Sequence, residues 1–157
     1  MKDPNNNVIY PGAPSVGLSN VGSYQAAGYP FITGSQNLDD GKVHMVEVPY
    51  VAKKVRVVNV SAVAKNIQVH FQSGSATAVT VPGEAGAQTI TAGCDVLEGL
   101  HFMSIPQNTS LELTAKFTKL YISNTSGTDD LRYQVLAELT NIPKRRMPHL
   151  TGSGITE

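Results

Sequence analysis

The middle of the chain carries short segments in which apolar and polar residues alternate, a pattern that predicts half-buried β-strands. The clearest segment spans residues 66–72, where every second side chain from Ile67 to Phe71 is apolar. Comparable segments, some of them rich in valine, occupy residues 44–50, 53–60, 109–115, 117–123 and 131–140. Weaker strand signals lie at residues 29–33, 77–81, 88–91 and 96–105.

Turn-forming pairs separate these segments, among them Asp40-Gly41, Pro82-Gly83 and Ser126-Gly127. No long window keeps the 3.6-residue period of a helix. About eight short strands at this spacing predict an all-β fold built as a single antiparallel β-sandwich. We expect a jelly-roll-like sandwich, and strand count alone leaves an immunoglobulin-like sandwich as the alternative.

The two ends of the chain differ in composition from the middle. Residues 1–25 contain three prolines, three glycines and few apolar side chains, so we expect an extended N-terminal arm. Residues 26–140 form the expected β-sandwich domain. Residues 141–157 contain two prolines and two glycines, which predict an extended C-terminal tail.

Charge and composition narrow the choice of partner. Twelve basic and twelve acidic residues cancel, so no overall field draws the chain toward nucleic acid or an anionic membrane. The apolar runs are shorter than a transmembrane helix, and the N-terminal residues lack the apolar stretch of a secretory signal. We expect neither nucleic acid nor membrane as a partner. The single cysteine, Cys94, allows no internal disulfide.

We find no arrangement of residues that specifies catalysis or a cofactor, and we expect a non-enzymatic protein without a bound metal. Cys94 and Ser153 lack the base or the strand–turn–helix setting that a nucleophile needs. The histidines are dispersed without metal-pair spacing, which favours surface or structural roles; they are His44, His70, His101 and His149.

Acidic residues cluster in two turns. Thr128-Asp129-Asp130 beside Asn124, and Asp39-Asp40-Gly41, offer oxygen ligands but match no established calcium loop. We therefore interpret both as solvated turns, with a cation site as the alternative. A carboxylate pair across two loops is the one route to an enzyme that the sequence leaves open. Its members would come from Asp95, Glu98, Asp129 and Asp130.

Two sets of residues suit contact with another protein. Aromatic residues in or beside the arm are candidate apolar anchors: Tyr10, Tyr24, Tyr29 and Phe31. The dense basic run of Lys144, Arg145 and Arg146 suits contact with an acidic surface, because it lacks the aromatic neighbours that stack on nucleic-acid bases.

The organisation of the chain resembles that of the small head decoration (cement) proteins of tailed bacteriophages, several of which are jelly rolls or related β-sandwiches. The segments that carry the likeness are residues 24–34, 48–53, 67–71, 137–143 and 150–156. The likeness is one of architecture and composition over most of the chain, and it includes no diagnostic motif. The chain differs from the smallest decoration folds in its long C-terminal tail.

This resemblance implies a structural protein of the virion that binds the outer capsid lattice and stabilises the head. Its partners would be the major capsid protein and copies of itself, as a dimer or trimer. The chain would be made in the host cytoplasm and placed on the capsid exterior. A vertex or fibre-attachment protein of the same virion is one alternative, and a glycan- or receptor-binding β-sandwich module is another.

Overall fold

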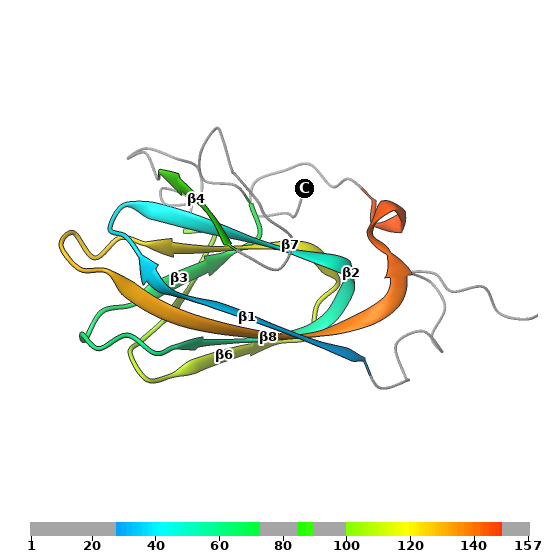
Figure 1. The fold of residues 1–157 in the computed structure, drawn as a ribbon, viewed down its shortest axis with the longest axis horizontal. Coiled ribbons are helices and arrows are strands. Elements are labelled where there is room, and N and C mark those ends of the chain that lie inside the picture. The colour runs from blue at the N-terminus through cyan, green and yellow to red at the C-terminus, as the bar shows by residue number, and fades with distance from the viewer. Residues whose placement is uncertain (1–27, 73–84, 90–99, 149–157) are drawn as a thin grey trace, which may run out of the picture.

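The computed structural model describes residues 28–72, 85–89 and 100–148. Within these ranges the chain forms β-strands and one short 3-10 helix (Figure 1). The elements are β1 (Tyr29–Leu38), β2 (Lys42–Asn59), β3 (Ile67–His70), β4 (Ala85–Thr89), β5 (Met103–Ile105), β6 (Ser110–Leu113), β7 (Phe117–Asn124), β8 (Leu131–Pro143) and η1 (Lys144–Arg146). All strand pairings are antiparallel, and the expected all-β fold is confirmed.

The 18-residue strand β2 belongs to both layers of the sandwich. Its first half pairs with β4 and β7, and its second half pairs with β6 and β8. Between the halves the strand bends, and exposed Pro49 lies where the β7 ladder is interrupted. Proline suits this position because it has no N–H to donate to a ladder. The bend is the right-hand corner of β2 in Figure 1.

The pairings assemble two sheets, which we call sheet I and sheet II. Sheet I has the order β1-β8-β2-β6, and sheet II has the order β4-β2-β7-β3-β5. The two halves of β2 act as separate strands, one in each sheet. With β4 left out, β1 pairs with β8, the first half of β2 pairs with β7, the second half of β2 pairs with β6, and β3 pairs with β5. In chain order the first strand thus pairs with the last, the second with the last but one, and so on inward. This nested pairing is the connectivity of a jelly roll, and β4 extends sheet II beyond β2.

The hydrophobic core lies between the two sheets, and β8 shows how the sequence builds it. Its buried residues are Leu131, Tyr133, Val135, Ala137 and Leu139. The alternate residues Arg132, Gln134 and Leu136 are exposed, as the period of two in a strand requires. Each large apolar side chain buried in this way contributes about 1.5–3 kcal/mol relative to exposure.

The outer faces of the two sheets differ in burial. Most outward positions of sheet II are buried, and they include Val43, Met45, Tyr121, Ser123 and His70. Outward positions of sheet I are largely open, with Ile32 75% and Leu136 42% exposed at paired positions of β1 and β8. Sheet I therefore presents the accessible broad face of the molecule within the described residues.

The expected strands agree with the structure in place and type within the described ranges, but several differ in extent. β1 continues to Leu38 instead of ending at residue 33, β4 begins at Ala85 instead of residue 88, and β5 begins only at Met103. Residues 44–50 and 53–60 form parts of one strand rather than two. The strand expected to end at residue 140 continues to Pro143, because Ile142 is fully buried and Thr140 Oγ1 accepts a hydrogen bond from the Ile142 amide. The first residues assigned to the tail thus belong to the sandwich. Residues 77–81, 90–91 and 96–99 lie outside the described ranges, as does the arm at residues 1–25.

Candidate functional site

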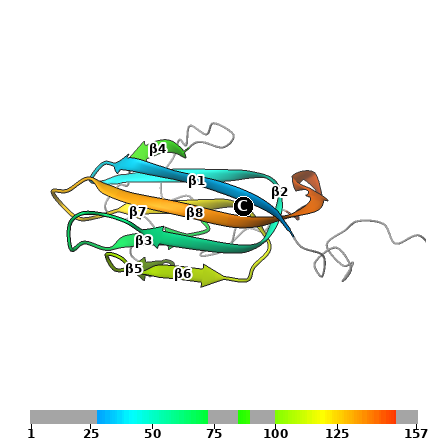
Figure 2. The ribbon, with the colours of Figure 1, turned by 60° about the horizontal axis from the view of Figure 1, so that its bottom comes forward.

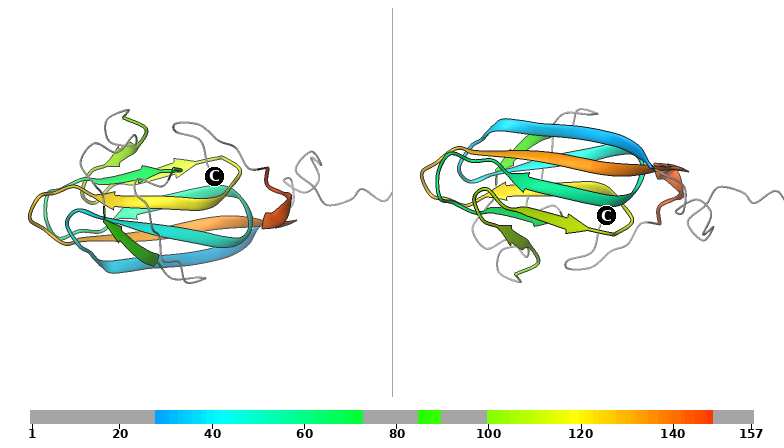
Figure 3. Two further views of the ribbon diagram at one scale, coloured as in Figure 1. Left: turned by 90° about the horizontal axis from the view of Figure 1, so that it is seen from above. Right: turned by 90° about the horizontal axis from the view of Figure 1, so that it is seen from below.

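Basic side chains gather at the end of the sandwich where β2 bends. The bend, the turn between β6 and β7, the end of β8 and η1 all lie at this end (Figures 2 and 3). We call this region the basic end and define it by Lys53, Lys54, Lys116, Lys119, Lys144, Arg145 and Arg146. Three acidic residues accompany them: Glu47, Glu112 and Glu138.

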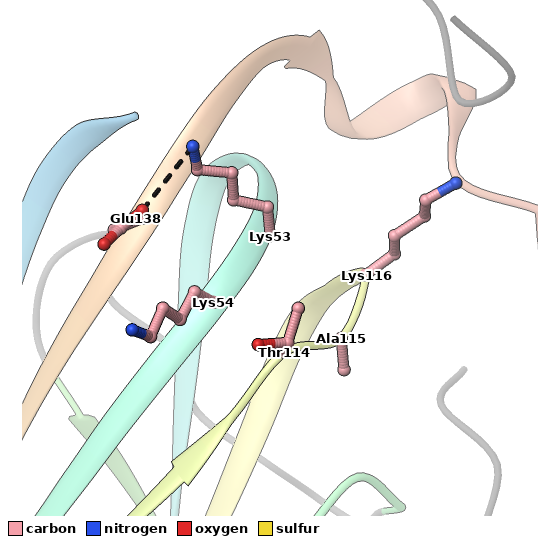
Figure 4. Close-up of a pocket in the computed structure, with 6 residues that line it drawn as sticks. All are labelled: Lys53, Lys54, Thr114, Ala115, Lys116 and Glu138. Carbon is pink, nitrogen blue, oxygen red and sulfur yellow. Dashed lines mark ion pairs between the residues drawn. The ribbon is translucent and has the colours of Figure 1, made fainter. Parts of the chain in front are cut away.

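A β-bulge places two of the lysines side by side. Ala52 pairs with Leu139 and Lys54 pairs with the next residue, Glu138, so Lys53 is the extra residue in β2. Neighbouring residues of a regular strand point to opposite faces, and a bulge removes this alternation. Figure 4 shows the side chains of Lys53 and Lys54 on the side of Glu138.

The bulge borders an open hollow of about 560 Å³. Lys53, Lys54 and Glu138 line one side, and residues 114–116 of the β6–β7 turn line the other (Figure 4). Lys53 Nζ lies 3.5 Å from Glu138 Oε2. Lys116 extends from the turn away from this pair in Figure 4. The hollow thus has three cationic side chains and one carboxylate on its walls.

An ion pair holds the second lysine of the bulge at the side of the hollow. Lys54 Nζ lies 2.8 Å from Glu112 Oε1 on the neighbouring strand β6. The hydrogen bond within this pair raises the pKa of Lys54 and lowers the pKa of Glu112. Both groups are therefore charged at neutral pH, and the pair is accessible to solvent and to an incoming partner.

The predicted basic run forms the other part of the basic end. Lys144, Arg145 and Arg146 make up η1 and are exposed. Lys144 Nζ lies 2.6 Å from Glu47 Oε1 of β2, which ties the helix to the sandwich. A second hollow, of about 450 Å³, lies here between Lys119 and Arg145. The structure thus joins the run to lysines that are distant in sequence.

Charge is unevenly distributed over the described residues although the whole chain is neutral. Seven of their eleven Lys and Arg residues belong to the basic end, but only three of their seven Asp and Glu residues do. The end therefore carries a net charge of about +4 at neutral pH. Acidic residues outside the basic end balance this positive charge, so the overall composition does not reveal it.

The acidic turns lie at the opposite end of the sandwich, and hydrogen bonds join them. Asp40 Oδ1 accepts the Gly127 amide at 2.7 Å, and Asn124 Nδ2 donates to the Leu38 and Asp129 carbonyls. In the described ranges no group of three or more His, Cys, Asp or Glu residues is arranged to hold a metal ion. Asp95 and Glu98, the other carboxylates considered for catalysis, lie outside the described residues.

The histidines were expected to have surface or structural roles. A surface role is wrong for His44 and His70, because both residues are buried. His44 Nδ1 lies 3.1 Å from the Tyr133 hydroxyl, across the core from sheet II to sheet I. His70 is hydrogen-bonded to Ser123 Oγ through Nε2 and to the Gln72 carbonyl through Nδ1. Burial lowers the pKa of His44, and it lowers that of His70 to about 4, so both rings are neutral at pH 7.

The predicted aromatic anchors are divided between described and undescribed residues. Tyr29 is 60% exposed at the start of β1, and Phe31 is half-buried against the core. Tyr10 and Tyr24 lie outside the described residues, as do Cys94, His149 and Ser153. Tyr29 and Tyr50 are the exposed tyrosines of the described part.

No family model, curated protein or solved structure matches the chain. No helix in the described part is long and apolar enough to cross a membrane.

Sequence reasoning identified Lys144, Arg145 and Arg146 but missed the other four members of the basic end. Lys53, Lys54, Lys116 and Lys119 are spread over 67 residues of sequence, and only the jelly-roll topology brings them together. The adjacent pair at 53–54 was the one available signal, because two neighbouring lysines in a valine-rich strand break its alternation.

Proposed function

We propose that the chain is a non-enzymatic decoration protein that docks its basic end on an acidic surface of a viral capsid lattice. The observation that carries this proposal is the convergence of seven cationic side chains from three chain segments on one end of the sandwich. The complementary partner is a protein surface rich in Asp and Glu, and the major capsid protein is the partner that the overall organisation favours.

The fold is compatible with this role. Jelly rolls occur in viral capsid proteins and in lectins, among other proteins. The fold therefore agrees with a capsid role but does not decide the function. The site argument is electrostatic: a patch of one sign steers and orients a partner of the other sign. The exposed positions of η1 and of the Lys54–Glu112 pair allow direct contact without rearrangement of the core.

Repetition of the capsid surface would convert weak contacts into stable occupancy. A single exposed ion pair contributes about 0–1 kcal/mol and is weakened by salt. Several such contacts made together by linked copies give much higher avidity than one copy achieves. Self-association as a dimer or trimer would therefore strengthen binding without any new contact to the capsid.

The test uses particles of the virus that encodes the chain, purified from a strain in which this gene is deleted. Full-length protein is added back, and binding is measured by co-sedimentation over a series of NaCl concentrations. We expect wild-type protein to bind and its affinity to fall steeply as salt increases. A variant with Lys54→Gln, Lys116→Gln and Arg145→Gln should bind about tenfold more weakly or worse, since three lost ion pairs amount to about 1.4 kcal/mol or more.

The matched control removes three cations away from the basic end, by Lys42→Gln, Lys65→Gln and Arg132→Gln. It has the same net charge as the first variant, so a difference between them reports the location of the charges. Equal loss of binding in both variants would refute docking through the basic end. Tight binding of duplex DNA in preference to particles, measured by gel shift, would assign the basic end to nucleic acid instead.

A further inference from the structure

A separate hollow lies on the open outer face of sheet I, near the opposite end from the lysine-lined hollow. It has a volume of about 460 Å³, within the range of pockets that hold small ligands. It is bounded by residues 32–36 of β1, residues 132–134 of β8, and Val60 after the end of β2. None of the residues that line it belongs to the basic end.

A glycine creates the depth of this hollow. Gly34 occupies an outward position of β1 between Ile32 and Gln36, so the row of side chains has a gap there. A Cβ atom at Gly34 would lie 2.6 Å from the Tyr133 carbonyl oxygen, which is closer than such atoms approach. The close contact between β1 and β8 therefore excludes every larger residue from this position.

Three polar side chains border the gap. Gln36, Arg132 and Gln134 are exposed, and none of their side chains has a hydrogen-bond or ion-pair partner among the described residues. The backbone of Arg132 is nevertheless held firmly. Its amide donates to Ser61 Oγ at 2.9 Å, and its carbonyl accepts from the Ser61 hydroxyl and the Val60 amide.

The geometry points to a binding site for an acidic sugar, a monosaccharide unit that carries a carboxylate; this is what we propose for the hollow. The Arg132 guanidinium offers the planar pair of N–H donors that matches a carboxylate. The two glutamine amides each provide donors and an acceptor for ring hydroxyls. Ile32 and Val60 supply apolar surface for the C–H groups of the ring.

The same residues argue against a neutral sugar. Neutral glycans are commonly held by stacking on exposed aromatic rings, and no aromatic side chain projects into this hollow from the described outer face. Tyr133, which lines it through its backbone, has its ring in the core. An ion pair with Arg132 supplies the orientation that stacking supplies elsewhere. This inference is independent of capsid docking through the basic end.

The experiment is a chemical-shift titration of the full-length protein by NMR with glucuronic acid and with N-acetylneuraminic acid. Glucose and N-acetylglucosamine serve as neutral sugars, and acetate and glutamate serve as carboxylates without a sugar ring. We expect saturable shifts at Gly34, Arg132 and Gln134 with at least one acidic sugar. Arg132→Gln should weaken this binding about tenfold or more, because a charge-assisted contact is lost.

The matched control is Arg56→Gln, which removes an exposed arginine from the same outer face but outside the hollow. It should bind like the wild type. The absence of saturable shifts with both acidic sugars would overturn the proposal, as would equal affinity in wild type and Arg132→Gln. Equal affinity for acetate or glutamate would show that the hollow recognises a carboxylate alone, which also overturns the acidic-sugar assignment.

Discussion

Acid should destabilise this fold through His70, whose ring lies on the buried outer face of sheet II. The ring is 2% exposed and is stacked on Tyr121, with centroids 5.6 Å apart. Burial is the main cause that lowers its pKa, and the hydrogen bond to the Gln72 carbonyl opposes it in part. A proton added to the ring would place a charge where the surroundings disfavour it, so acid selects the unfolded chain.

The magnitude follows from the difference in pKa between the two states. The pKa of His70 is about 4 in the folded protein and 6.5 in the unfolded chain. Above pH 6.5 both forms are neutral and stability is unaffected. Between pH 6.5 and pH 4 only the unfolded chain takes up the proton, so the free energy of unfolding falls with pH. The loss reaches about 3 kcal/mol at pH 4, because one pKa unit corresponds to about 1.4 kcal/mol.

The assay is urea unfolding of wild type and His70→Gln at several values from pH 7 to pH 4, followed by far-UV circular dichroism because the chain lacks tryptophan. The variant should be the less stable protein at pH 7, since it loses hydrogen bonds of the ring. The free energy of unfolding of the variant should then fall less with acid than that of the wild type. Between pH 7 and pH 4 the difference between the two free energies should shift by about 3 kcal/mol in favour of the variant. Other titrating groups are common to both proteins and cancel. A constant difference across this range would refute the reasoning.

Three further changes test other parts of the structure. Asn124→Ala removes the side chain that closes the loops of the acidic end, and it should lower the free energy of unfolding by about 2–4 kcal/mol in urea titrations. Ile142→Ala should lower the free energy of unfolding by about 2–5 kcal/mol, because this side chain is fully buried. A chain that stops after Pro143 should keep the thermal midpoint of the wild type. Equal loss of stability in both variants would contradict the strand boundary. Tyr133→Phe removes the partner of His44 and should lower stability by about 1–2 kcal/mol at pH 7, measured by the same denaturation; no change would show that the buried contact is not formed.

Sequence patterns predicted the parts of the fold that depend on local alternation. β8 is the best case, because its buried and exposed residues follow a period of two from Leu131 to Leu139. The polar side of β3 was harder to place. Gln68 and His70 alternate with apolar residues, as in a strand with one side in water, yet both are buried. Alternation reports a difference between two faces, and it does not report whether the polar face is covered.

The candidate site was less accessible to sequence reasoning because it depends on contacts between distant segments. The bulge at Lys53 cannot be recognised from the sequence of β2 alone. It is defined by the pairing with β8, in which Ala52 lies opposite Leu139 and the next paired residue lies opposite Glu138. Likewise, residues 44–50 and 53–60 were predicted as two separate strands, whereas they belong to one strand that bends from one sheet into the other. A long strand with a bend and two short strands with a turn share nearly the same local sequence.

The position of β8 in sheet I bears on how the protein is made. β8 lies between β1 and the second half of β2, although a ribosome synthesises it about 70 residues or more after both. Until residues 131–143 emerge, those two strands have no strand to join them, and sheet I is incomplete. Domains dominated by such distant pairings fold slowly. During synthesis the apolar faces of β1 and β2 therefore stay uncovered until β8 has been made. We expect sheet I to fold after the synthesis of β8 and not while the chain is still being elongated.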